Sequence, residues 1–86
     1  MSSSHQLSLR TEFIHTSITF LFQTTYHPKK DDLRVLTLLT YLNAAMPPGR
    51  YEDFDIQEVR RALEVLREKG YVYVDEVRDL VGLAEL

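Results

Sequence analysis

The sequence predicts a small α+β domain, mainly helical, in which three helices precede a C-terminal β-hairpin. Two observations favour this fold class. Apolar residues recur at helical spacing along residues 55–69, and after Gly70 the run Tyr71–Val74 consists of strong strand formers. The chain has 86 residues, which suffices for one domain with a modest core. We expect residues 1–8 to be a flexible N-terminal tail and residues 9–86 to form a single domain.

The first helix is predicted over residues 9–25. The alternative is a strand over residues 17–24, because β-branched threonines are frequent and bulky apolar residues alternate there. No Gly, Pro, Asn or Asp interrupts the segment to make a hairpin turn, and one strand of about twenty residues would be unusually long. We therefore favour the helix, whose apolar face would consist of Phe13, Ile14, Ser17, Ile18, Leu21 and Phe22.

The second helix is predicted over residues 28–45. Pro28 suits the first turn of a helix, and Asp31 and Asp32 near the start would complement the helix dipole. Two prolines and a glycine within residues 46–50 end the segment. This helix should lie at the centre of the core, because it carries a wide apolar face made of Leu33, Leu36, Leu39 and Leu42.

The third helix is predicted to begin near Asp55 and to stop at Gly70, which can adopt the left-handed conformation that ends many helices. Either Asp53 or Asp55 can be the N-cap residue. Phe54 can pack back on Val59 as a hydrophobic staple. The apolar ladder of this helix is Ile56, Val59, Leu63 and Leu66.

The hairpin is predicted as a strand over residues 71–77, a turn at Arg78–Asp79 and a weaker strand over residues 80–86. The second strand is weaker because Gly82 and Ala84 are poor strand residues.

Tyrosines and valines alternate in the first of these strands, so either pair can face the core. We favour Val72 and Val74 on the core side, with Tyr71 and Tyr73 exposed.

Composition excludes several classes of protein. The chain has no cysteine, so it has neither disulfides nor thiolate metal sites, which suits a cytoplasmic protein. It lacks an apolar run long enough to span a membrane, a Gly-rich phosphate loop and a nucleophile elbow. His5, His15 and His27 are too far apart in sequence to share one helical turn as metal ligands. We expect a non-enzymatic protein with no membrane partner, no cofactor and no metal.

Residues 59–72, Val-Arg-Arg-Ala-Leu-Glu-Val-Leu-Arg-Glu-Lys-Gly-Tyr-Val, resemble the recognition helix and the start of the wing in the winged helix-turn-helix superfamily. The family form is a helix with paired leucines and a charged pair, followed by a glycine, an aromatic or aliphatic residue and a valine. The resemblance covers residues 33–86 and agrees with the predicted order of elements. The chain departs from the family in its longer link over residues 46–54. Its hairpin is also acidic where the family is often basic, at Asp75, Glu76 and Asp79.

The resemblance implies a small DNA-binding transcriptional regulator, dimeric through its N-terminal helix. Glutamine suits adenine and arginine suits guanine or phosphate as hydrogen-bond donors. The alternative for these side chains is a solvated helix surface with pairs such as Arg60–Glu64. The residues that would contact double-stranded DNA are Arg50, Gln57, Arg60, Arg61 and Arg67.

The overall charge favours a second function. The net charge is −3, whereas DNA-binding domains are usually basic because they neutralise phosphates. The alternative is therefore a protein-interaction module of winged-helix shape, a regulatory or inhibitory factor that binds a protein partner. Its acidic surface would include a run at the start of the third helix, formed by Glu52, Asp53, Asp55 and Glu58.

Overall fold

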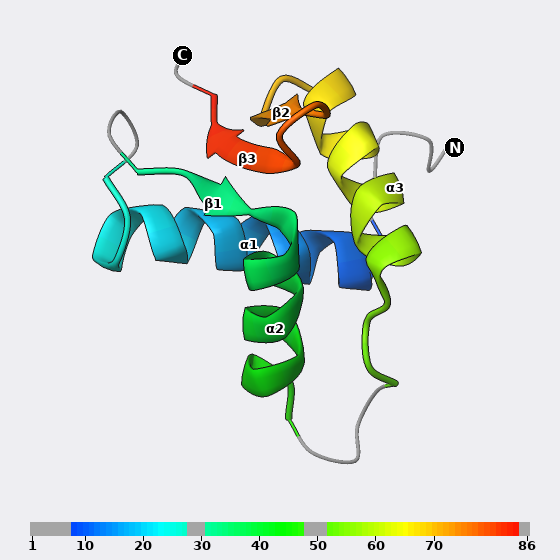
Figure 1. The fold of residues 1–86 in the computed structure, drawn as a ribbon. Coiled ribbons are helices and arrows are strands. Elements are labelled where there is room, and N and C mark those ends of the chain that lie inside the picture. The colour runs from blue at the N-terminus through cyan, green and yellow to red at the C-terminus, as the bar shows by residue number, and fades with distance from the viewer. Residues whose placement is uncertain (1–7, 28–30, 48–51, 85–86) are drawn as a thin grey trace.

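Three helices and a small antiparallel sheet make up the fold (Figure 1), which is the mainly helical α+β class that the sequence predicts. The computed structural model describes residues 8–27, 31–47 and 52–84. The predicted tail over residues 1–8 lies outside these ranges except for Ser8. The elements are α1 (Leu9–Thr24), β1 (Leu33–Arg34), α2 (Val35–Ala45), α3 (Ile56–Glu68), β2 (Val72–Asp75) and β3 (Leu80–Leu83).

The first segment is a helix, and the alternative strand is wrong. Ser8 caps α1, because its hydroxyl accepts a 3.1 Å hydrogen bond from the backbone N–H of Thr11. The buried residues of α1 follow the helical period: Ile14, Ser17, Ile18, Leu21 and Phe22. The threonines do not prevent this, since most lie on exposed or half-buried positions. One of them, Thr24, donates its hydroxyl to the carbonyl of Phe20 at 2.8 Å within the helix.

The predicted start of the second helix is wrong by seven residues. The helix begins at Val35, and the residues before it form β1, which pairs antiparallel with β3. The free edge of β3 offers backbone hydrogen bonds, so an extended Leu33 both joins the sheet and is fully buried. Asp31 is consequently no part of the helix; its carboxylate accepts a 2.7 Å hydrogen bond from the backbone N–H of His27. Pro28 lies outside the described residues.

The link between α2 and α3 is fixed by Asn43 and ends in a capped helix. The Asn43 amide donates to the carbonyl of Phe54 at 3.1 Å and accepts from its N–H at 2.7 Å, which satisfies both backbone groups of a buried residue. Asp55 is the N-cap, and its carboxylate accepts from the N–H of Glu58 at 2.8 Å. Phe54 and Val59 share the core cluster, as a staple requires.

The two strands of the hairpin are shorter than predicted. The carboxylate of Asp75 accepts hydrogen bonds from the N–H groups of Val77 and Arg78 at 3.1 and 3.0 Å, so the chain turns directly after β2. The turn occupies residues 76–79, and Asp79 has a positive φ of 59°. Gly70 has a φ of 83°, which confirms the predicted helix stop.

The sheet has three strands in the order β1-β3-β2, one more than the predicted hairpin. Tyr73 faces Gly82 across the strand pair. A Cβ at position 82 would lie 2.2 Å from Cζ of Tyr73, so the glycine leaves room for the ring. Val72 is buried while Tyr71 and Tyr73 are exposed, which confirms the predicted orientation.

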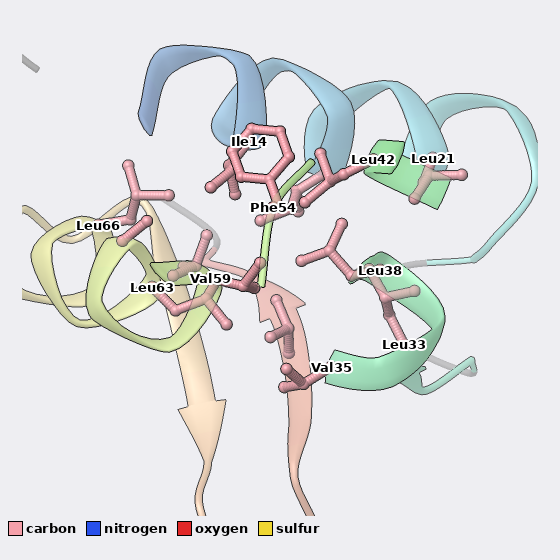
Figure 2. Close-up of a cluster of buried hydrophobic side chains, with 14 of the residues drawn as sticks. Ile14, Leu21, Leu33, Val35, Leu38, Leu42, Phe54, Val59, Leu63 and Leu66 are labelled. Atoms are coloured by element: carbon pink, nitrogen blue, oxygen red, sulfur yellow. The ribbon is translucent and has the colours of Figure 1, made fainter. Parts of the chain in front are cut away.

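The core lies between α1, α2, α3 and one face of the sheet (Figure 2). Two leucines of α2, Leu38 and Leu42, are fully buried at its centre, whereas Leu36, predicted to lie on the apolar face, is 61% exposed because the helix begins later and turns Leu38 inward instead. Leu38 and Leu42 share the core cluster with Ile14 from α1 and Leu66 from α3, which are also fully buried. Each such aliphatic side chain contributes about 2–5 kcal/mol when compared with alanine.

Candidate nucleic-acid interface

The outer face of α3 carries most of the residues predicted to contact DNA. The buried side of α3 consists of Val59, Ala62, Leu63 and Leu66. The polar side chains on the opposite side of the helix therefore point away from the core. The outer face of α3 is defined here by six residues: Gln57, Arg60, Arg61, Glu64, Arg67 and Glu68. Arg50 lies outside the described residues.

Arg60 is bonded to the hairpin turn. Its Nη2 donates to Oδ2 of Asp79 at 3.0 Å, and the two side chains are 50% and 39% exposed. Asp79 is the last residue of the turn before β3, and it has a positive φ. The sequence did not suggest the pair, because the two residues are nineteen positions apart and meet only when the hairpin folds over α3.

Arg67 pairs within its own helix. Its Nη2 donates to Oε2 of Glu64 one turn earlier, and this hydrogen bond raises the pKa of the guanidinium. The predicted pair Arg60–Glu64 does not form; each of these residues has a different partner.

Gln57 and Arg61 differ from these two arginines. Both are exposed, and neither has a side-chain hydrogen bond or an ion pair with another described residue. They are four positions apart and therefore neighbours on the same side of the helix. The first two turns of α3 thus present an amide and a guanidinium that are free to bind a ligand.

The hairpin turn is acidic. Asp75 accepts two hydrogen bonds from Arg78, one from its backbone N–H and one from its guanidinium. These bonds, the backbone one first, lower the pKa of the Asp75 carboxyl. Glu76 and Asp79 add two more carboxylates, while Arg78 is the one cation of residues 75–79. The turn therefore has a net negative charge beside the outer face of α3.

A cleft of about 540 Å³ separates α3 from the hairpin turn. Its apolar floor comes from Val35, Leu63 and Val74. Its charged rim consists of Arg60, Glu64, Glu76 and Asp79. With Arg67, which is bonded to Glu64, the rim has three carboxylates against two guanidinium groups, and this excess of one negative charge suits a cationic group.

The start of α3 is held against α1 by a charged pair that the sequence did not predict. Arg10 donates from Nε and Nη2 to the two carboxylate oxygens of Glu58 at 2.5 and 2.8 Å. The guanidinium carbon also lies 4.2 Å from the ring centroid of Phe54. The carboxylate raises the pKa of Arg10. Glu58, part of the predicted acidic run, is thereby neutralised and removed from the outer face.

The described residues contain no cluster of three or more His, Asp or Glu side chains that could hold a metal ion. Within those same ranges no helix combines the length and apolar character needed to cross a membrane.

Comparison with known proteins adds no relative: the chain matches no family model, no curated protein and no solved structure.

Proposed function

We propose that the chain is a small non-enzymatic DNA-binding regulator of winged-helix shape that acts in the cytoplasm. The order α1-β1-α2-α3-β2-β3 supports the proposal, since a winged helix requires three helices and then a hairpin. The pairing of the short β1 with β3 is compatible with that architecture. In this arrangement α3 enters the major groove, which is wide enough to accept a helix.

The observation that carries the proposal is the free pair Gln57 and Arg61 on the first two turns of α3. Recognition helices contact base edges mainly with N-terminal residues. An arginine can donate two hydrogen bonds to guanine, and a glutamine can form two with adenine by donating one and accepting the other. Each such bidentate contact discriminates between bases by about 1–3 kcal/mol.

The ion pair of Arg60 is compatible with DNA binding. An exposed pair of this kind contributes about 0–1 kcal/mol, because both charges are solvated before and after it breaks. A phosphate can therefore replace Asp79 as the partner of Arg60. The carboxylates of the hairpin turn oppose this exchange, so we expect weak, strongly salt-dependent binding from a single domain.

The acidic cleft favours a second candidate function, binding of a protein partner. A lysine or arginine side chain of the partner would enter between α3 and the hairpin turn and meet Glu64, Glu76 and Asp79. Charge complementarity of this kind selects partners and accelerates their association.

The variant Asp79→Asn distinguishes the two functions, because it has opposite effects on them. Asparagine tolerates a positive φ, so the turn should be kept. Because asparagine is uncharged, it binds Arg60 more weakly than aspartate does and repels phosphates less. We expect tighter binding of a mixed-sequence DNA duplex at low salt, and weaker binding of a lysine-rich peptide.

Glu12→Gln is the matched control, because it removes one negative charge from an exposed residue of α1, outside α3 and the cleft. The affinities should be measured by fluorescence anisotropy at two salt concentrations. Weaker DNA binding by Asp79→Asn, or no duplex binding by either protein, would contradict the proposed function.

A further inference from the structure

Strand β2 forms an edge of the sheet and lacks the residues that commonly block strand pairing. The order β1-β3-β2 gives β2 one neighbouring strand among the described residues. Its four residues, Val72–Asp75, include no proline and no lysine, which many proteins place on such edges to prevent pairing. Three of the four are strong strand formers. An open edge of this kind can accept a further strand from another chain.

The pairing of β2 with β3 fixes which backbone groups face the open edge. Just before β2, the carbonyl of Tyr71 accepts a 3.2 Å hydrogen bond from the N–H of Ala84, in the same register as the strands. Hydrogen-bonded and non-hydrogen-bonded pairs alternate along an antiparallel ladder. Tyr73 is therefore bonded to β3, whereas Val72 and Val74 are not. The N–H and C=O groups of both valines point to the open edge, where they bond no other described residue.

The other side of β3 agrees with this alternation. The N–H of Val35 donates to the carbonyl of Asp79 at 3.0 Å, in the register that pairs Leu33 with Val81. By the same alternation Val81 is bonded to β1, so its N–H and C=O groups do not face Val74, which is its partner in β2. The backbone of Val74 is thus left without a partner in the sheet.

The cleft between α3 and the hairpin turn adjoins this edge. Val74 forms part of the cleft floor and is half-buried. A residue of an added strand that is opposite Val74 projects to the same side of the sheet as Val74 does, and hence toward the cleft. The rim has an excess of one negative charge, and its Glu76 forms no ion pair with another described residue. A lysine or arginine is the residue type that this position suits.

We propose that β2 binds an extended segment of a partner protein as an additional antiparallel strand, with a lysine or arginine opposite Val74 inserted into the cleft. The inference rests on the second candidate function, binding of a protein partner, and adds the way in which the partner binds. Backbone hydrogen bonds to Val72 and Val74 would supply affinity, and the cleft would select the cation. A second copy of β2 is a poorer occupant, because it would bring Asp75 and Glu76 to a cleft that is already acidic.

The peptide acetyl-Thr-Lys-Thr-Val-Thr-amide tests the proposal, because its lysine is opposite Val74 when its valine is opposite Val72. It is titrated into the isotope-labelled full chain, and each backbone amide is followed by NMR. A short peptide binds weakly, since its loss of conformational freedom offsets most of the gain from a few contacts, so the titration extends to millimolar concentrations. We expect the amide protons of Val72 and Val74 to move downfield and to exchange more slowly with solvent. That of Tyr73, already bonded to β3, should change less.

Two N-methylated peptides separate strand pairing from simple insertion of a lysine. Methylation of the lysine amide removes a donor that faces β2 and should weaken binding by about tenfold, the effect of losing one hydrogen bond and leaving its acceptor unpaired. The matched control is methylation of the central threonine, whose amide faces solvent, and it should leave the affinity unchanged. A peptide with glutamate in place of the lysine should bind more weakly than either, because the cleft repels it.

The outcomes distinguish the strand from the partner. Equal affinities of the two methylated peptides would overturn the added strand, yet leave insertion of a lysine into the cleft, and with it the second candidate function, intact. No change at any residue of β2 or of the cleft would contradict the inference and the second candidate function together. Shifts of Val72 and Val74 that grow with protein concentration in the absence of peptide would identify a second copy as the occupant and overturn the proposal.

Discussion

The outer sides of α1 and α3 differ although both helices bury an apolar stripe in the same core. The outer face of α3 is almost entirely ionised, and two of its three arginines are held by carboxylates. The outer side of α1 is nearly uncharged and presents Leu9 and Phe20 to solvent. A solvated charged face is stable without any partner, whereas exposed apolar side chains gain free energy when they are covered. Under the proposed function, α3 stays solvated until it binds a charged ligand.

The buried stripes of α1 and α3 should contribute similarly to the free energy of unfolding, although the outer sides of the two helices differ. Ile14→Ala in α1 and Leu63→Ala in α3 each remove most of a side chain that is at most 2% exposed. Each should lower the free energy of unfolding by about 2–5 kcal/mol, through lost burial and the cavity left behind. Urea unfolding measures both values. A loss below 1 kcal/mol at either site would show that the packing described for that helix is wrong.

The pair Arg10–Glu58 joins α1 to α3, and its removal should have an intermediate effect on the free energy of unfolding. Its side chains are 29% and 28% exposed and form two parallel hydrogen bonds, so it should exceed an ordinary surface pair. A double-mutant cycle with Arg10→Met and Glu58→Gln should give a coupling energy of about 1 kcal/mol. Arg67 and Glu64 provide the control cycle within α3, where we expect weaker coupling. Equal coupling energies in the two cycles would show that Arg10–Glu58 is no stronger than an exposed pair within α3.

The smallest effect concerns the acidic turn beside α3. The pKa of Asp75 is lowered in the folded state by the backbone N–H and the guanidinium of Arg78. Its contribution to stability is therefore fully present above its unfolded pKa of about 3.9 and is lost as the pH falls through the lower folded pKa. Asp75→Asn keeps an acceptor for the turn but cannot titrate. Its melting temperature should fall less than that of the wild type below pH 4, and parallel acid titrations would contradict this role.

Sequence patterns predicted the helices and the hairpin because each has a local cause. The apolar period of Ile56, Val59, Leu63 and Leu66 and the left-handed Gly70 act within a few residues of the chain. The errors concern partners that are distant in sequence. Leu33 and Arg34 become a strand only because β3 offers an edge, and a pattern search over residues 28–45 cannot detect that edge.

The candidate site shows the same division. Helical spacing correctly placed Gln57, Arg60, Arg61 and Arg67 on exposed positions of α3. It could not reveal that Asp79 holds Arg60, since that pairing depends on how the hairpin folds. Which arginines are free is therefore a property of the tertiary structure.

The central claim, that the outer face of α3 binds DNA, is tested most directly by the salt dependence of Arg61→Ala. Arg61 has no partner among the described residues, so its removal should leave the fold unchanged. The affinity for duplex DNA should be measured across a salt series for the wild type, Arg61→Ala and the control Lys69→Ala at the opposite end of α3. We predict that Arg61→Ala binds more weakly and, if Arg61 contacts a phosphate, that its slope of log K against log salt is smaller by about 1. If Arg61 binds a base, its discrimination between sequences should fall instead. Affinity, slope and discrimination all equal to those of the wild type would contradict the account.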